Sequence, residues 1–283
     1  MNTQNVWFVT GASKGLGLSL VKQLLTGGQR VAATSRSLDD LVRAVGTHDH
    51  FLPLAVDLKT ESSVAQAIAQ TITAFGRIDV VVNNAGFGLV GSLEELSDAE
   101  SRENFEVNVF GSLNVIRNVM PHLRAQQSGH IFNISSIGGF TGAFPGFGIY
   151  CATKFAVVGF SESLAEEVKS FGVHVTVVEP GYFRTDFLTS GSLNVPGNQI
   201  EAYQAVRDSQ QTHQSQINGN QPGDPEKAVA ALIRIASESN PPLHLFLGQD
   251  AYDMAHEKIK AVQRDLETWK AVTVSTGFET ANA

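Results

Sequence analysis

The N-terminal region of the sequence places a glycine-rich turn between a strand pattern and a helix pattern. Val6–Thr10 is a short run of β-branched and aromatic residues, typical of a buried strand. Gly11–Gly17 follows at once, and leucines then recur at helical spacing until Gly27 and Gly28 end the pattern. Glycines at such a turn let the backbone approach a pyrophosphate, and the helix N-terminus favours the anion. The region therefore predicts a nucleotide-binding unit, with a tight turn that binds no ligand as the alternative.

Apolar, β-branched runs recur along the chain and alternate with longer segments of helical periodicity. Further strands are expected near residues 30–35, 50–56, 80–82, 130–134, 173–179 and 243–247. Helices are expected near 61–75, 97–127, 150–171, 224–238 and 250–270. This alternation indicates an α/β fold with one doubly wound, mostly parallel sheet. In such sheets, ligands bind at the carboxyl ends of the strands.

One domain is expected to span residues 1–283, because a chain of this length can bury a single large core. Residues 1–187 would form the cofactor-binding and catalytic core. Residues 188–223 are rich in Ser, Asn, Gln and Gly, which favours a substrate lid with one helix near 201–211, or else a disordered surface insertion. Residues 224–283 would add helices and the last strand.

Charge and cysteine content narrow the functional classes. The net charge of −8 argues against a role on nucleic acid or an anionic membrane. The single cysteine, Cys151, excludes an internal disulfide framework and a Cys-based zinc cluster, and the histidines show no metal-ligand spacing, so no metal is expected. No signal peptide or membrane-spanning pattern is evident, which predicts a cytoplasmic protein acting on a small molecule.

The stretch Ser135–Lys154 carries the groups best suited to chemistry. Tyr150 and Lys154 are four residues apart, so a helix would place them on one face. The positive charge of Lys154 is expected to lower the pKa of the Tyr150 phenol. With a hydroxyl from Ser135 or Ser136 at the end of a strand, these groups can reduce a carbonyl or oxidise an alcohol beside a hydride carrier.

Three asparagines stand out. Asn108 lies in an apolar run close to Gly111, which predicts a local break in the long helix and a buried polar role, with a surface amide as the alternative. Asn83 and Asn84 follow a strand. Of this pair, Asn84 is assigned to the cofactor and Asn83 to the structure.

The second strand predicts which cofactor is preferred. An NAD site usually has an acidic residue there to bind the ribose 2′-hydroxyl, whereas this chain has Ser35 and Arg36. Lys14 adds a positive charge within the glycine loop. A hydroxyl and two cations suit a 2′-phosphate, so NADP(H) is favoured over surface charges without a ligand. Asp57 either binds the adenine amino group or caps the next helix.

The chain resembles the short-chain dehydrogenases/reductases. The resemblance covers residues 6 to about 187 and rests on TGASKGLG at 10–17, Asp57-Leu58, NNAG at 83–86, Asn108, Ser136, YxxxK at 150–154 and Pro180-Gly181. It implies a Rossmann-type fold, a catalytic tetrad of Asn108, Ser136, Tyr150 and Lys154, and an NADP(H) preference associated with Lys14. It implies also that Lys154 binds the nicotinamide ribose, that Asn108 anchors a water, and that long helices near 100–127 and 150–171 form a homodimer or homotetramer. The expected cofactor-binding residues are Gly11, Ser13, Lys14, Gly15, Leu16, Gly17, Ser35, Arg36, Asp57, Leu58, Asn84, Ala85, Gly86, Tyr150, Lys154, Pro180, Gly181, Phe183 and Thr185.

Aromatic side chains near these motifs predict the substrate class. Phe87, Phe144, Tyr182 and Phe187 are expected to line an apolar pocket, although some of the aromatic residues in this region would only pack in the core. The substrate is then a neutral, hydrophobic ketone or aldehyde, or the corresponding alcohol. A redox-neutral enzyme on the same scaffold and a non-catalytic NADP(H) sensor are the alternatives.

Overall fold

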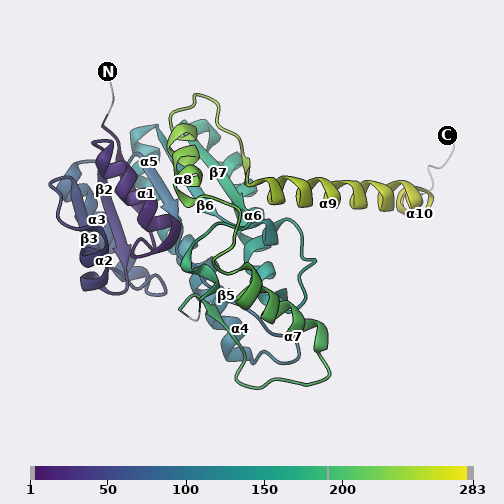
Figure 1. Cartoon of the computed structure of the whole chain (residues 1–283). Helices are drawn as coiled ribbons and strands as arrows, with labels where there is room; N and C mark the ends of the chain where they lie inside the picture. Colours follow the sequence, from purple (N-terminus) through teal and green to yellow (C-terminus); the bar gives the residue numbers. More distant parts are fainter. Residues whose placement is uncertain (1–3, 190, 279–283) are drawn as a thin grey trace, which may run out of the picture.

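The computed structural model describes residues 4–189 and 191–278. Seven parallel strands form one sheet in the order β3-β2-β1-β4-β6-β7-β9, and helices cover both of its faces, so the predicted α/β fold is confirmed (Figure 1). The strands are β1 Val6–Val9, β2 Arg30–Ser35, β3 Phe51–Ala55, β4 Val80–Asn83, β6 Gly129–Ile134, β7 Val173–Pro180 and β9 His244–Leu247. The chain order reverses between β1 and β4, which is the point where doubly wound sheets bind ligands.

Alternate residues of each strand enter different cores. In β1, Phe8 packs with helices α3 (Glu61–Phe75), α5 (Gly111–Gln126) and α6 (Gly148–Val168). Trp7 and Val9 pack on the other face with α1 (Gly15–Thr26), α2 (Leu38–Val45) and α8 (Pro225–Ile235). Because both faces of the sheet are covered, its strands are almost continuously apolar.

Helix α2 was not expected from the sequence. Ser37 caps it by accepting a hydrogen bond from the Asp40 amide, and only Leu41 is buried among its eight residues. One buried position is too little to give a helical period. The two helix caps that the sequence predicts are present in the structure. Ser97 and Glu100 make a capping box at α4 (Asp98–Phe105), and Asp224 caps α8 ahead of Pro225.

The long helix breaks where a break was expected. After α4 the backbone forms a π-helical segment, η1 (Glu106–Phe110), and then continues as α5. Asn108 lies within η1 and is buried. A π-bulge redirects side chains within a helix and is frequent at functional sites, so this break places Asn108 against the loop that follows β4.

Residues 188–189 and 191–223, here called the lid segment, form helices and a short strand in the structure. β8 (Leu193–Asn194) pairs with β5 (Gly88–Leu89), and α7 (Gln204–Gln211) continues into the π-helical segment η5 (Thr212–Ile217). Arg207 of α7 makes an ion pair with the buried Glu95 at 2.6 Å. The Glu95 carboxylate also accepts hydrogen bonds from the Ser92 and Ile200 amides, both at 2.7 Å. This carboxylate therefore holds the lid to the core.

A helix near the end of the described residues extends away from the rest of the molecule (Figure 1). It comprises α9 (Gln249–Thr268) and the short α10 (Lys270–Val274). In the described part of the chain, no helix has the length and apolar character needed to cross a membrane.

Candidate active site

A cleft of about 1130 Å³ opens at the carboxyl ends of the strands. With two exceptions, every residue that the sequence analysis assigned to catalysis, cofactor or substrate lines it. The exceptions are Gly17 and Asn108, which lie behind the lining. Motifs spread over most of the chain thus meet in one space, as the parallel sheet predicts.

The glycine loop packs directly on the end of β4. Gly11 has a φ of +66°, and a Cβ there would lie 2.7 Å from the Ala85 Cα. A Cβ on Gly17 would lie 2.5 Å from the Asn84 Nδ2 and 2.6 Å from the Gly11 carbonyl oxygen. Side chains at these positions would push the two segments apart. The loop is therefore an open backbone cradle at a helix N-terminus, which fits a dinucleotide pyrophosphate.

Asn83, the last residue of β4, and Asn84, the residue after it, both make structural hydrogen bonds. Asn83 donates to Asn133 Oδ1 at 2.8 Å within the sheet, which agrees with its predicted structural role. Asn84 Nδ2 donates to the carbonyls of Thr10 and Gly11, both at 2.9 Å. The Asn84 amide nitrogen therefore braces the glycine loop, although the residue also lines the cleft as expected.

Two cations lie at the end of the cleft expected to bind the adenosine. Arg36 follows β2 and is exposed on the lining. Lys14 is also exposed, and its Nζ donates to the Gly191 carbonyl of the lid at 2.8 Å. Asp57 accepts from the Lys59 amide and the Thr60 hydroxyl, both at 3.1 Å, so its carboxylate makes cap-type contacts at the start of α3.

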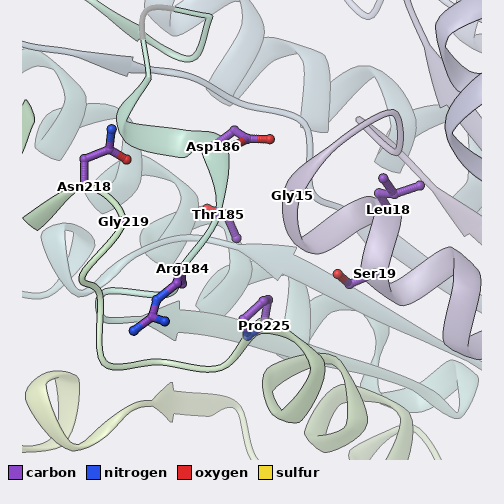
Figure 2. Close-up of a pocket in the computed structure, with 9 residues that line it drawn as sticks. All are labelled: Gly15, Leu18, Ser19, Arg184, Thr185, Asp186, Asn218, Gly219 and Pro225. Carbon is purple, nitrogen blue, oxygen red and sulfur yellow. The ribbon is translucent and has the colours of Figure 1, made fainter.

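A smaller hollow of about 300 Å³ adjoins the cleft at Gly15, Thr185 and Asp186. Figure 2 shows the N-terminal turns of α1 on one side and the segments around Thr185 and Asn218 on the other. Arg184 borders this hollow and donates to the Gln221 carbonyl at 3.1 Å. A loop of the core and the end of the lid thus meet beside the glycine loop.

The candidate acid–base residues converge on the inner wall. Tyr150 and Lys154 lie on α6, and the Lys154 Nζ is 5.8 Å from the centre of the Tyr150 ring. Lys154 Nζ donates to the Ile134 carbonyl at 2.9 Å, and burial lowers its pKa to about 8. Ser136 lines the cleft and forms a hydrogen bond with Tyr150. Ser135 is buried, and its hydroxyl donates to the Lys154 carbonyl at 2.9 Å.

The pKa of Tyr150 shifts in the opposite direction to the one expected. Burial raises the pKa of Tyr150 above its ordinary value, the Ser136 hydrogen bond opposes this, and Cys151 and Tyr182 add to the rise. Burial dominates, because removing the phenol from water costs the phenolate more than the Ser136 hydrogen bond restores. The phenol is therefore protonated at neutral pH.

Asn108 positions the loop after β4 instead of facing the cleft. Its Oδ1 accepts from the Phe87 amide at 3.0 Å, and its Nδ2 donates to the Phe87 carbonyl at 3.0 Å and to Thr153 Oγ1 at 3.1 Å. A Cβ on Gly86 would lie 3.0 Å from Asn108 Oδ1 and 3.5 Å from Lys154 Nζ. Asn108 thus links the β4 loop to α6 directly behind Lys154.

The far end of the cleft is less apolar than predicted. Phe87, Phe144 and Phe187 line it, but so do Tyr182 and His213. His213 Nδ1 lies 2.7 Å from the Ser209 carbonyl, so Nδ1 carries the proton and Nε2 accepts from the Tyr182 hydroxyl at 2.8 Å. Burial lowers the pKa of His213 and raises that of Tyr182 to about 12, so both are neutral.

Gln221 is a further polar residue that sequence reasoning missed. It lines the cleft with only 1% of its surface exposed, and its Oε1 and Nε2 have no hydrogen-bond partner among the described residues. Neither His213 nor Gln221 lies in a motif, because each comes from a polar lid segment with no period. A lone polar residue in such a segment gives no signal until the fold places it.

The comparisons with known proteins agree with this arrangement. Residues 5–194 match the model of the family described as short chain dehydrogenase. The chain belongs to this family. This short-chain dehydrogenase is 37% identical to oxidoreductase BOA17 of Botryotinia fuckeliana, over 96% of this chain and 98% of that one. It is also 37% identical to a 3-ketodihydrosphingosine reductase of Bacteroides thetaiotaomicron, over 85% of this chain and 86% of that one.

Solved structures support the same assignment. A short-chain dehydrogenase from Streptomyces avermitilis matches with a TM-score of 0.88 and 36% identity, over 98% of this dehydrogenase and all of that chain. A 3-ketoacyl-(acyl-carrier-protein) reductase from Brucella melitensis, solved with NADH, has a TM-score of 0.71, 26% identity and coverages of 86% and 96%. ElxO, solved with NADP, has a TM-score of 0.71, 25% identity and coverages of 87% and 97%.

Proposed function

We propose that this short-chain dehydrogenase interconverts a carbonyl compound and its alcohol with NADP(H). The observation that carries the proposal is the meeting of Ser136, Tyr150 and Lys154 on the wall of a cleft whose other wall is an open glycine cradle. A hydroxyl, a protonated phenol and a cation at that place are the groups that carbonyl reduction needs.

The glycine loop, the β2 end and Thr185 would hold the cofactor along the cleft. The bound nicotinamide would supply or accept the hydride. The preference for NADP(H) rests on Ser35 standing where NAD sites have an acid, and on the exposed cations Arg36 and Lys14 beside it. One structural relative was solved with NADH and another with NADP, so the relatives alone do not select between the two cofactors.

In reduction, Ser136 would hold the substrate carbonyl oxygen and Tyr150 would donate the proton to it. The raised pKa of Tyr150 suits this direction, because the phenol then carries its proton at neutral pH. Lys154, with a pKa of about 8, is mostly charged at pH 7 and stabilises negative charge on the phenol oxygen as the proton leaves. Asn108 holds the loop after β4 against α6. A water bound to Asn108 that passes protons to Lys154 remains a prediction.

The proposed substrate is a neutral ketone or aldehyde with an apolar body and one polar group away from the carbonyl. Phe87, Phe144 and Phe187 provide the apolar surface. The Tyr182–His213 pair and the unpaired amide of Gln221 provide polar contacts on the same wall. The name of the Bacteroides relative describes a ketone reductase, which supports the same reaction class.

The decisive experiment follows cofactor absorbance with NADPH and separately with NADH over a panel of neutral aryl, aliphatic and polar-substituted ketones and aldehydes. We expect substrate-dependent NADPH oxidation that falls by ~10²–10⁴ in Tyr150→Phe. Tyr252→Phe, which removes an exposed phenol outside the cleft, is the matched control. NADPH binding without turnover on any carbonyl, or full activity in Tyr150→Phe, would reject the proposed reaction.

We also propose that two or four copies associate through the helices α4–α5 and α6. Phe110 at the end of η1 and Phe155 on α6 are large apolar side chains exposed on these helices. Burying them against a second copy would remove apolar surface from water. Light scattering that gives the mass of one chain, 30.3 kDa, contradicts this.

A further inference from the structure

Helix α9 leaves the body of the molecule after its first two turns. Ala251 and Ala255 are buried, and the partly buried Met254 packs in the same cluster beside Phe140 and Phe246. From His256 onward every described residue is exposed, except Ala261, which is partly covered (Figure 1). Isolated helices of this length are marginal in water, because most helical stability in proteins comes from packing.

An apolar stripe runs along α9 and includes Trp269, the residue directly after it. Its members recur at alternating intervals of three and four residues, which is the spacing of the a and d positions of a coiled coil. Five of the six are exposed, by 42% to 62%, and Ala255 is the buried sixth. The α9 stripe consists of Tyr252, Ala255, Ile259, Val262, Leu266 and Trp269.

The charges around the stripe argue against a lipid surface as its partner. Helices that lie on membranes carry a polar face rich in Lys and Arg. The charged side chains of α9, together with Lys270 just beyond it, are instead acidic and basic in nearly equal number. They are Asp250, Asp253, Glu257, Asp265 and Glu267 against Lys258, Lys260, Arg264 and Lys270.

We propose that the α9 stripe pairs with the α9 stripe of a second copy of this chain, in antiparallel orientation. The side chains of the stripe are complementary to those of a second stripe that runs in the opposite direction. Ile259 would lie against Val262 of the second copy, at the centre. Ala255 is covered by its own body, so Leu266 of the second copy would lie at the edge of the body beside it, and Tyr252 would lie against Trp269 at each end.

Flanking charges support this orientation. Lys258 and Asp265 each precede an a position, and neither has an ion-pair partner among the described residues. Antiparallel pairing brings Lys258 beside Asp265 of the second copy twice, at two places along the same side of the helix pair. Parallel pairing would oppose Ala255 to Ala255 and Trp269 to Trp269, which packs poorly, and would crowd both bodies at one end. The pairing is also isologous, as closed dimers require.

The first test compares two variants with the same change in charge. Leu266→Glu places a carboxylate within the stripe, and Thr268→Glu places one on the exposed face beside it. Measured by light scattering on the full chain, Leu266→Glu should have half the mass of the wild type, while Thr268→Glu keeps the wild-type mass. Carbonyl reductase activity should survive in both variants, because α9 lies outside the cleft. Equal masses for wild type and Leu266→Glu overturn the proposal.

The second test measures orientation and is independent of the interface proposed for α4–α6. Tyr252→Cys and Trp269→Cys are prepared separately and then mixed under oxidising conditions. Cys151, the one native cysteine, is buried. Antiparallel pairing predicts disulfide-linked dimers in the mixture and none in either variant alone, since like positions lie far apart along the axis. Cross-linking of each variant alone, or flotation of the wild type with anionic vesicles in place of dimerisation, rejects antiparallel pairing.

Discussion

The two ends of the cleft are built by different means. At the cofactor end, the backbone shapes the site: Gly11 and Gly17 occupy places where a Cβ does not fit, and Asn84 ties the loop to the end of β4. At the lid end, side chains far apart in sequence do this work, as in the pairs Glu95–Arg207 and Tyr182–His213. A backbone-defined site suits one invariant ligand, whereas a site assembled from side chains can change its ligand by substitution.

The two ends also differ in how many polar groups remain unpaired. At the glycine loop, the Thr10 hydroxyl, the Asn84 amide nitrogen and the neighbouring backbone groups satisfy one another. At the lid end, Gln221 is buried with both amide atoms free of partners in the described structure, and the Nε of Arg207 is also unpaired. Unpaired buried polar groups lower stability. The lid end should therefore be the more easily perturbed part.

The largest effect is expected where the lid is held to the core. Glu95→Gln removes the charge that Arg207 faces and leaves the Ser92 and Ile200 amides competing for one acceptor oxygen. Breaking a buried ion pair typically costs about 3–5 kcal/mol. We expect hydrogen exchange in α7 to rise by about a hundredfold or more, with the KM for the substrate raised and NADPH affinity little changed.

Low pH should have the same effect on hydrogen exchange in α7 as the Glu95→Gln variant, because protonation also removes the charge of Glu95. Burial tends to raise the pKa of Glu95, but hydrogen bonds from Ile200 and Ser92 together with the charge of Arg207 lower it overall. A carboxyl with a lowered folded-state pKa stabilises above its unfolded value of 4.5, and that stabilisation is lost as the pH falls through the folded pKa. Exchange in α7 should thus rise below about pH 4.5. Glu103→Gln, in an exposed pair with Lys59, is the control, and equal effects of the two variants contradict a special role for Glu95.

The contrast explains what the sequence could predict. The strands, the capping box, the break at Asn108 and the cleft lining follow from local patterns, which report backbone geometry within a few residues. Helix α2, with one buried residue, gives no such pattern. His213 and Gln221 gain their environment only when the lid folds over the core. The pKa of Tyr150 was expected in the wrong direction because spacing shows a neighbouring charge but not burial.

A smaller loss is expected at the cofactor end. Gly11→Ala forces a positive φ on alanine and drives its Cβ against the Ala85 backbone, which cannot move without shifting the end of β4. We expect NADPH affinity to fall by about a hundredfold, about 2.7 kcal/mol, in a fluorescence titration.

Gly28→Ala is the matched control for that loss. Gly28 also has a positive φ, of +75°, but a Cβ there meets nothing within 4 Å. This variant should lower stability by about 1 kcal/mol from backbone strain alone and leave NADPH affinity unchanged. If both variants bind NADPH equally, the loop does not depend on its contact with Ala85.

Gln221 tests the lid end through two effects of opposite sign. Gln221→Leu removes two unpaired buried polar atoms, so the free protein should be stabilised by about 1 kcal/mol in thermal or urea unfolding. The same variant should raise the KM for a polar-substituted ketone by about tenfold, because a hydrogen bond to the substrate is lost. Gln214→Leu, on the exposed side of η5, should show neither effect. Destabilisation with an unchanged KM would mean that Gln221 is structural.

An effect of similar size concerns cofactor preference. Arg36 is exposed on the cleft lining and has no ion-pair partner among the described residues, whereas the Lys14 ammonium already donates to the lid at Gly191. Arg36 is therefore the cleaner probe of a 2′-phosphate. Arg36→Ala should weaken NADPH binding by about tenfold at low salt and leave NADH binding unchanged, since a solvent-exposed charge contact is screened. Arg43→Ala, an exposed arginine on α2, should change neither. Equal losses of NADPH and NADH affinity would mean that Arg36 attracts either cofactor only by its charge. Selectivity at the cofactor end would then come from backbone groups, as the shape of that end does.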